Sequence, residues 1–307
     1  MNSKIKKVFE LFPQFEIFIR QLYYSNTTVY KKLKLSKPKT KVKYSVIPNL
    51  FDKIKNKINM LGIENGDILI VHSSMDKLYS LGVSSKNILD YLIEKVGDRG
   101  TLVLPVYPII NRNNLVDRQK YDVKKTVCST GMIPNIFLRY SEVVRSEFPY
   151  NSLAAKGKKA SEMMKNNLKS DLAHGPNSSW EYCINNHAKV LFLGVEAYHT
   201  ATIVHAVEDL LDKEWPISDW YEEKQYIIKN ENSEKIFTAR IRKQYWSRFL
   251  TEHYTAKVFE DKLLLKRLKI EGIPIEYIPD SKKLIDFLIN ETKTGKLYLK
   301  IPKKYWK

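Results

Sequence analysis

Two side chains in the second half of the chain have the types and spacing of an acid–base pair. His205 and Glu208 are three residues apart in a segment whose apolar pattern predicts a helix over 200–211, so both lie on one helical face. A carboxylate beside an imidazole raises its basicity and selects which ring nitrogen carries the proton, which suits a general base acting on an amine. Thr202 precedes His205 by about one turn, so its hydroxyl is expected on the same side. A plain surface contact is the alternative, since exposed ion pairs are common and contribute little to stability.

A second polar group follows the first predicted strand. His72, Ser73 and Ser74 end an apolar run, and Lys77 and Gly82 come shortly after. Hydroxyls, a lysine and the free amides of a helix start can bind a phosphate or pyrophosphate, although the same residues also suit a simple strand end and turn. No Walker or Rossmann glycine pattern accompanies them, so nucleoside triphosphate and dinucleotide chemistry have no support.

The sequence offers no metal site. His199 is six residues from His205, so the two side chains do not share a helical face. The two cysteines, Cys128 and Cys183, form neither a disulfide framework nor a metal-ligand spacing. Cysteine usage of this kind is typical of a reducing compartment, and we expect a cytoplasmic protein.

The elements that position these residues alternate between strands and helices. Continuous apolar runs predict buried strands, and amphipathic segments predict helices. The strands are expected over 68–72, 101–106, 152–155 and 189–195, and the helices over 48–61, 85–96, 131–139, 158–167 and 200–211. A loop of about twenty residues after the second strand is long for a compact domain and is a candidate substrate loop.

The last third of the chain has a different pattern. Two alternating segments, 225–229 and 235–240, flank a polar turn and predict a β-hairpin. Helices over 256–268 and 281–290, with a short strand over 275–278, are expected to follow. The predicted fold class is therefore α/β, a three-layer α/β/α sandwich with an added antiparallel β-hairpin and C-terminal helices.

Composition and charge limit the kinds of protein that the chain can be. Its 307 residues are 43% hydrophobic and 28% charged, which excludes a mainly disordered or collagen-like chain, and no apolar run is long enough to span a bilayer. The net charge of +18 is uneven, because residues 1–50 carry +9 and residues 280–307 carry +5. We expect a basic, aromatic-rich extension over residues 1–44, followed by a single domain over residues 45–307.

The extension suggests two kinds of partner. Its aromatic residues recur at roughly helical spacing and are interrupted by Pro13, which predicts two short helices that pack onto the domain or onto a second copy in a homodimer. The alternative is a peripheral contact with the inner membrane surface, with aromatic rings among the headgroups and lysines on anionic lipid. No nucleic-acid partner is expected, since no recognised binding motif accompanies the charge.

A series of short motifs along the chain resembles the aminoglycoside 3-N-acetyltransferase family, the antibiotic N-acetyltransferases. The series covers roughly residues 48–290. It consists of His72-Ser73-Ser74, Gly100–Pro105, Thr130–Pro134, Arg145-Ser146 with Pro149, Ser152–Ala155, Gly175–Ser179, Lys189–Gly194 and Thr202–Glu208.

The resemblance implies an N-acyltransferase that binds an acyl-CoA, such as acetyl-CoA, together with an amino-sugar acceptor, and that needs no metal. His205 would then be the general base, Glu208 would support it, and the Thr202 hydroxyl would stabilise the oxyanion. The expected coenzyme A contacts are His72, Ser73, Ser74, Lys77 and Gly82. The expected acceptor contacts are Tyr107, Phe148, Asn151 and His174, of which Phe148 and Asn151 depart from the family pattern and His174 is alternatively a turn histidine.

The sequence is compatible with more than one acceptor. A strongly basic protein attracts anionic partners, which favours N-acylation of a nucleotide- or lipid-linked amino sugar in surface-polysaccharide synthesis. An acidic stretch over 208–223 supports the alternative, acetylation of a polycationic aminoglycoside and hence antibiotic resistance. A third hypothesis, from another class, is a non-catalytic protein that binds an anionic ligand or a membrane surface.

Overall fold

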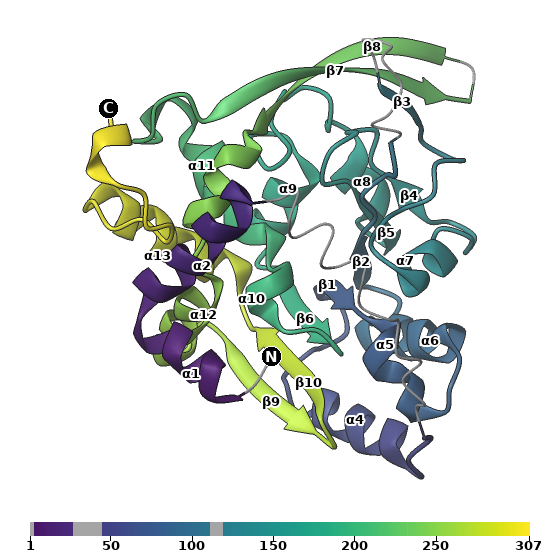
Figure 1. Cartoon of the computed structure of the whole chain (residues 1–307). Coiled ribbons are helices and arrows are strands. Elements are labelled where there is room, and N and C mark those ends of the chain that lie inside the picture. The colour runs from purple at the N-terminus through teal and green to yellow at the C-terminus, as the bar shows by residue number, and fades with distance from the viewer. Residues whose placement is uncertain (1–2, 27–44, 111–118, 232) are drawn as a thin grey trace.

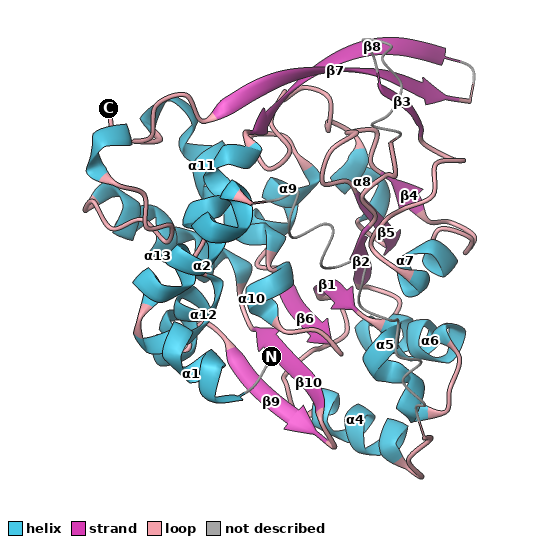
Figure 2. Cartoon of the chain, in the orientation of Figure 1, coloured by secondary structure: helices cyan, strands magenta, loops and turns pink. Residues whose placement is uncertain are grey.

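The protein is built around a seven-stranded sheet (Figures 1 and 2). The computed structural model describes residues 3–26, 45–110, 119–231 and 233–307. The strands lie in the order β4-β5-β2-β1-β6-β10-β9. Their bounds are β1 Ile68–Ser73, β2 Thr101–Pro105, β4 Val144–Arg145, β5 Leu153–Gly157, β6 Lys189–Leu193, β9 Lys266–Ile270 and β10 Ile273–Ile278. The three central strands, β2, β1 and β6, are parallel, and the outer strands pair antiparallel.

Helices cover both faces of this sheet because its strands are apolar on both sides. Along β1, Ile68 and Ile70 join one hydrophobic cluster, whereas Leu69 and Val71 join the other. One layer contains α4 Leu50–Asn59, α5 Met75–Leu78, α6 Ser85–Val96 and α7 Met132–Phe137. The opposite layer contains α8 Ala160–Met164, α9 Ser179–Asn185, α10 Ala197–Thr200, α11 Ala206–Leu211, α12 Glu252–Asp261 and α13 Ser281–Lys293. The predicted three-layer α/β/α architecture is confirmed.

The predicted β-hairpin is present and is longer than expected. It consists of β7 Tyr221–Asn230 and β8 Ser233–Arg242, and it extends across the top of the molecule in Figure 1. A short strand within the expected loop, β3 Gln119–Asp122, pairs parallel with β7 and completes a second, three-stranded sheet. Because β8 ends at Arg242, the hairpin brings this side chain back to the main body.

Two predicted helices differ from the structure. The helix expected over 200–211 is divided into α10, a 3₁₀ turn over Thr202–His205 and α11. Its first part contains four β-branched residues within five positions. In a helix, the preceding turn restricts the side-chain rotamers of such residues, which lowers their helix propensity. The helix expected over 256–268 ends at Asp261, and the chain then turns through Leu263 at φ 58° to enter β9, a strand that the sequence pattern did not predict.

The N-terminal residues form the predicted pair of short helices. These are α1 Ser3–Leu11 and α2 Pro13–Ser25, and they pack against α12 and the 3₁₀ turn that precedes it, as the purple ribbon in Figure 1 shows. Pro13 takes the first position of α2, where its missing N–H costs no hydrogen bond. The lysine-rich stretch over 31–43 lies outside the described residues. None of the described helices combines the length and the apolar character needed to cross a bilayer.

The contact between β5 and β2 generates a stability prediction. Gly157 has φ +130°, and a Cβ atom there would lie 2.2 Å from the carbonyl oxygen of Gly100. Gly272 has φ +84° with open space around it, so it is a matched control for the backbone conformation alone. We expect Gly157→Ala to lower the free energy of unfolding by about 3 kcal/mol or more, and Gly272→Ala by about 1 kcal/mol. Urea denaturation measures both values, and equal losses would contradict the role assigned to this close approach.

Candidate active site

The carboxyl ends of the three parallel strands meet at one edge of the sheet. β1 ends at Ser73, β2 at Pro105 and β6 at Leu193, and ligands bind at such strand ends in open α/β sheets. A cavity of about 170 Å³, here called the strand-end cavity, lies at this edge. It is lined by Val71, His72, Ser73, Pro105, Tyr107, Thr130, Pro134, Thr200 and Thr202.

Two polar atoms of the strand-end cavity have no partner among the described residues. His72 Nε2 and Ser73 Oγ are buried and make no hydrogen bond within the described part of the chain. The His72 ring stacks on Phe192 at 5.0 Å between centroids, and burial lowers the pKa of His72 to about 3, so its imidazole is neutral. Buried polar groups are normally hydrogen-bonded. These atoms therefore fit a ligand that brings its own donors and acceptors.

A second cavity of about 180 Å³ adjoins the first and is here called the His205 cavity. Its lining residues are Tyr107, Tyr150, Asn151, Ala173, His174, Thr202, His205, Glu208, Asp209, Arg240, Ile241 and Arg242. Tyr107 and Thr202 line both cavities. The Tyr107 hydroxyl donates to Thr202 Oγ1 at 2.6 Å, and Thr202 donates to the carbonyl of Thr200 at 3.2 Å. Burial raises the pKa of Tyr107, so it remains a donor to Thr202 at the junction of the two cavities.

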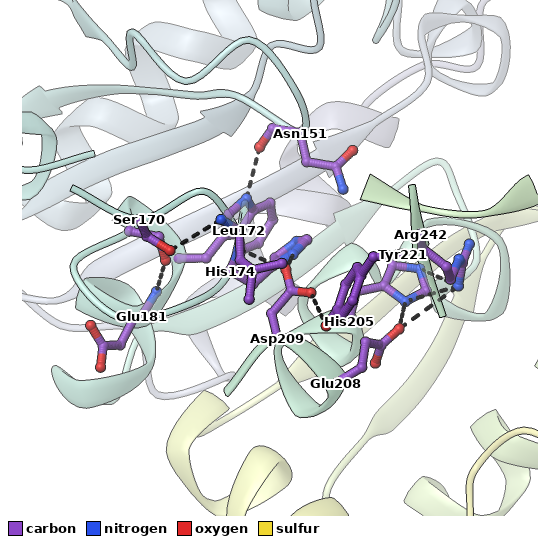
Figure 3. Close-up of polar contacts among 12 residues, drawn as sticks. Asn151, Ser170, Leu172, His174, Glu181, His205, Glu208, Asp209, Tyr221 and Arg242 are labelled. Carbon is purple, nitrogen blue, oxygen red and sulfur yellow. Dashed lines mark hydrogen bonds and ion pairs between the residues drawn. The ribbon is translucent and has the colours of Figure 1, made fainter. Parts of the chain in front are cut away.

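The predicted acid–base pair is present in the His205 cavity. His205 Nδ1 lies 3.0 Å from Glu208 Oε1, as the dashed line in Figure 3 shows, and Glu208 is buried. The Tyr298 hydroxyl donates to the same carboxyl at 2.8 Å and lies 3.2 Å from Nδ1. The contact is therefore not a solvated surface pair. It directs Nδ1 toward the carboxyl, so Nε2 is the ring nitrogen that is turned away from Glu208.

The electrostatics of this pair differ from the sequence-based expectation of raised basicity. Burial lowers the pKa of His205 well below 6.5, and the Arg242 guanidinium lowers it further. Burial also raises the pKa of Glu208 to about 8, against the opposing effect of Arg242. Arg242 Nη1 lies 3.2 Å from Nδ1 and 3.4 Å from Nε2 of the imidazole. Burial and Arg242 thus keep the imidazole unprotonated at neutral pH, which is the form that accepts a proton.

A second histidine–carboxylate pair lines the same cavity. His174 Nδ1 lies 3.0 Å from Asp209 Oδ2, which also accepts from the His174 backbone N–H. Asp209 Oδ1 accepts from the Tyr221 hydroxyl at 3.0 Å. The His174 and His205 rings lie 6.2 Å apart between centroids (Figure 3), and His174 Nε2 is buried without a partner in the described residues. His174 is therefore part of the cavity wall and not an isolated turn residue.

The structure gathers most, but not all, of the predicted site residues. His72 and Ser73 line the strand-end cavity, whereas Ser74, Lys77 and Gly82 do not. Tyr107, Asn151 and His174 line the His205 cavity. The exception among the expected acceptor contacts is Phe148, which is buried against Phe237 beneath the hairpin and does not line the cavity. Phe148 departs from its expected position because β3, β7 and β8 form a small hydrophobic core of their own that takes up its ring.

Two residues of the site had no signal in the sequence. Arg242 reaches His205 from the end of β8, and Tyr298 reaches Glu208 from the segment after α13. Arg242 is 37 positions from His205, and Tyr298 is 90 positions from Glu208. These separations are too long for helical or strand periodicity to indicate a contact. Within the described ranges, no three His, Cys, Asp or Glu side chains are grouped as a metal site requires.

The fold and cavities define an α/β protein with adjoining cavities at a parallel strand edge and a buried histidine–carboxylate pair in one of them. A family model described as aminoglycoside 3-N-acetyltransferase matches residues 70–290. This chain belongs to that family, and the resemblance seen in its motifs is thereby confirmed.

Individual relatives agree with this assignment. Aminoglycoside N(3)-acetyltransferase IX of Micromonospora chalcea is 29% identical over 175 residues, which are 52% of this chain and 62% of the relative. Aminoglycoside N(3)-acetyltransferase VII of Streptomyces paromomycinus is 25% identical over 52% of this chain and 60% of the relative. The alignment with this chain thus spans about three fifths of each of these relatives.

Solved structures share the fold. The apoenzyme of aminoglycoside acetyltransferase AAC(3)-IVa has a TM-score of 0.65 at 19% identity, and covers 86% of this chain and 95% of its own. A binary complex of AAC-IIIb with CoASH has a TM-score of 0.67 at 17% identity, and covers 80% of this chain and 97% of its own. The names of these relatives give no support to the expectation of surface-polysaccharide synthesis.

The placement of Arg242 generates a prediction about the imidazole. We expect His205 of the wild-type protein to titrate well below pH 6.5. Nuclear magnetic resonance of labelled histidine measures this titration. Arg242→Gln removes the positive charge that disfavours the imidazolium, so the pKa of His205 is expected to rise. Arg242→Lys keeps the charge and is the control, with a smaller rise. A wild-type pKa above 6.5, or one that Arg242→Gln leaves unchanged, would contradict the electrostatics described here.

Proposed function

We propose that this protein is an N-acyltransferase that moves a short acyl group, in the simplest case acetyl, from coenzyme A to the amine of an amino sugar. The single observation that carries the proposal is the position of Thr202. Its side chain lies where the strand-end cavity meets the His205 cavity, so a thioester in the first would face an amine in the second. Family membership supports the same class of reaction.

The proposed transfer is direct. The acceptor amine attacks the thioester carbonyl carbon from the His205 cavity, and its proton passes to His205 Nε2 while Glu208 and Tyr298 hold Nδ1. A C–N bond forms, the C–S bond breaks, and the thiolate leaving group regains a proton. The Thr202 hydroxyl, which accepts from Tyr107, rotates from the Thr200 carbonyl to donate to the developing oxyanion.

The polar atoms that line the strand-end cavity match the hydrogen-bonding groups of acyl-CoA. The pantetheine arm contains amide groups, which would satisfy the unpartnered atoms His72 Nε2 and Ser73 Oγ. No acyl-enzyme is required, and Cys183, whose thiol pKa is raised by burial, lines neither cavity. We place the reaction in the cytoplasm, in keeping with two free cysteines.

The charge of the His205 cavity bears on the acceptor. Its two carboxyl groups, Glu208 and Asp209, already accept hydrogen bonds from protein donors, which leaves less acceptor capacity for an ammonium group of a polycation. Arg240 pairs with Asp171 and Asp212. Arg242 has no carboxylate nearer than 3.9 Å among the described residues. Because its ion pair with Glu208 is long, the Arg242 guanidinium can also bind an anionic group, which favours an amino sugar that carries such a group over the aminoglycosides named for the relatives.

Removal of the base is the first test of the proposed function. His205→Ala is expected to lower kcat with acetyl-CoA by about 100-fold or more, because the proton of the amine loses its acceptor. Dissociation of coenzyme A should be unchanged. Thiol release measures the turnover. His187→Ala is the matched control, since His187 is paired with Asp280 at the protein surface, and it should leave kcat unchanged. Near-normal turnover in His205→Ala would assign the base to another residue.

Acceptor charge is the second test. We expect thiol release to be at least tenfold more efficient, as kcat/KM, with a phosphorylated or nucleotide-linked amino sugar than with the same sugar lacking phosphate. Arg242→Gln should abolish this preference, and Arg242→Lys should retain part of it. Arg248→Gln is the control, because Arg248 lies over the Tyr245 ring outside the His205 cavity. Higher efficiency with aminoglycosides in the wild type would instead assign the polycationic acceptor.

A further inference from the structure

We propose that the acyl donor carries a chain of about four carbons, bound in an apolar cavity beside the candidate active site. The inference rests on the proposed acyl transfer and names the donor of that reaction. The cavity has a volume of about 100 Å³ and is here called the acyl cavity. Its apolar lining residues include Ala201, Val204, Leu250, Ala256, Phe259 and Ile278.

The acyl cavity adjoins both cavities of the candidate active site. Thr202 lines all three cavities, Thr200 also lines the strand-end cavity, and His205 also lines the His205 cavity. A thioester carbonyl carbon beside Thr202 carries a sulfur and an acyl chain, and it is attacked by the amine. The sulfur occupies the strand-end cavity and the amine enters from the His205 cavity, so the third cavity is the one that remains for the acyl chain.

The polar groups on the wall of the acyl cavity are bonded to other parts of the protein. Each side-chain hydroxyl group that lines the cavity has a hydrogen-bond partner within the chain. For example, Thr251 and Thr255 both donate to the carbonyl oxygen of Tyr298, at 3.1 Å and 3.2 Å. The Glu252 carboxylate pairs with Arg20 at 2.7 Å. A hydrocarbon chain in this cavity therefore leaves these groups satisfied.

The other two cavities differ in this respect. The strand-end cavity has His72 Nε2 and Ser73 Oγ, and the His205 cavity has His174 Nε2, as buried atoms without a partner in the described residues. No atom of this kind among the described residues belongs to a side chain that lines the acyl cavity. The first two cavities thus match the polar parts of the substrates, and the third matches an apolar part.

Small side chains create the space. Ala197 begins α10, Ala201 follows its last residue, and Ala256 lies on α12, which packs against α10. An apolar cavity of about 150 Å³ holds benzene, so the acyl cavity, with about 100 Å³, has room for about four carbons. A butyryl chain fits this space, whereas an acetyl group, with only its methyl group beyond the carbonyl carbon, leaves most of it empty.

The N-terminal helices contact two residues of the cavity wall. Lys6 on α1 lies over the Tyr198 ring, 5.3 Å from its centroid. Glu16 on α2 accepts the backbone N–H of Glu252 at 3.1 Å, at the first turn of α12. Because Tyr198 and Glu252 both line the acyl cavity, the full chain is needed to test it.

Phe259 limits the length of the chain that fits. Its ring lines the acyl cavity and also a neighbouring cavity of about 330 Å³ beside α12 and α13. A smaller residue at this position would join the two cavities, and the joined space would accept a longer acyl chain.

Isothermal titration calorimetry of the full-length protein with acyl-CoAs of increasing length tests the proposal. The wild type is expected to bind butyryl-CoA about tenfold or more tightly than acetyl-CoA, because each further methylene group buried in an apolar site strengthens binding about fourfold. Octanoyl-CoA, whose chain is too long for the acyl cavity, should bind more weakly than butyryl-CoA.

Two variants change the cavity in opposite directions. Ala256→Leu fills it and should remove the preference for butyryl-CoA over acetyl-CoA. Phe259→Ala enlarges it and should shift the preference from butyryl-CoA to octanoyl-CoA. Coenzyme A, which has no acyl chain, is the control ligand, and its dissociation constant should be the same in all three proteins. Circular dichroism melting verifies that each variant is folded.

Equal affinity of the wild type for acetyl-CoA and butyryl-CoA would overturn the proposal, as would a preference that Ala256→Leu leaves unchanged. Thiol release with an amino-sugar acceptor, measured alongside, separates this proposal from the proposed function. Tighter binding of butyryl-CoA without thiol release from any donor would support the acyl cavity and contradict acyl transfer. Thiol release without any preference for chain length in binding would support acyl transfer and overturn the acyl cavity.

Discussion

The contact between Glu208 and His205 is the interaction on which the site depends. A buried carboxyl group must be matched by donors, and here the imidazole Nδ1 and the Tyr298 hydroxyl match it. The same contact fixes the orientation of the ring, so that Nε2 is turned away from Glu208 and has Arg242 Nη1 at 3.4 Å. Burial and Arg242 together keep the imidazole unprotonated at neutral pH. The buried carboxyl group thus fixes the orientation of the candidate base, whereas burial and Arg242 set its protonation state.

The sheet supplies the second constraint. Because β2, β1 and β6 are parallel, their carboxyl ends meet at one edge, and the loops that follow them close two adjoining cavities. The 3₁₀ turn between α10 and α11 contains Thr202, which lines both cavities. The hairpin adds Arg242 from the opposite side. A local run of β-branched residues and the long-range topology of the chain therefore act together at one point.

Sequence patterns were sufficient to predict the elements with strong periodicity and the contacts between neighbours along one helix. The central strands, the hairpin and the pairing of His205 with Glu208 follow from spacing alone. Arg242 and Tyr298 do not, because their contacts depend on how distant elements fold back. The pKa of His205 was predicted in the wrong direction for the same reason, since burial and a guanidinium from β8 outweigh the neighbouring carboxyl group. Phe148 is the opposite case. The sequence predicted it as a site residue, but its side chain is buried in the hydrophobic cluster of the hairpin.

A crystal structure with bound coenzyme A would show where the thiol sulfur lies relative to Thr202 and His205. We expect the thiol sulfur in the strand-end cavity beside Thr202, with the pantetheine arm passing His72 and Ser73. His205 Nε2 should face the sulfur from the adjoining His205 cavity. A sulfur bound elsewhere, for example in the large lysine-lined groove beside α8, would contradict it. So would a His205 ring that the complex separates from the sulfur by protein atoms.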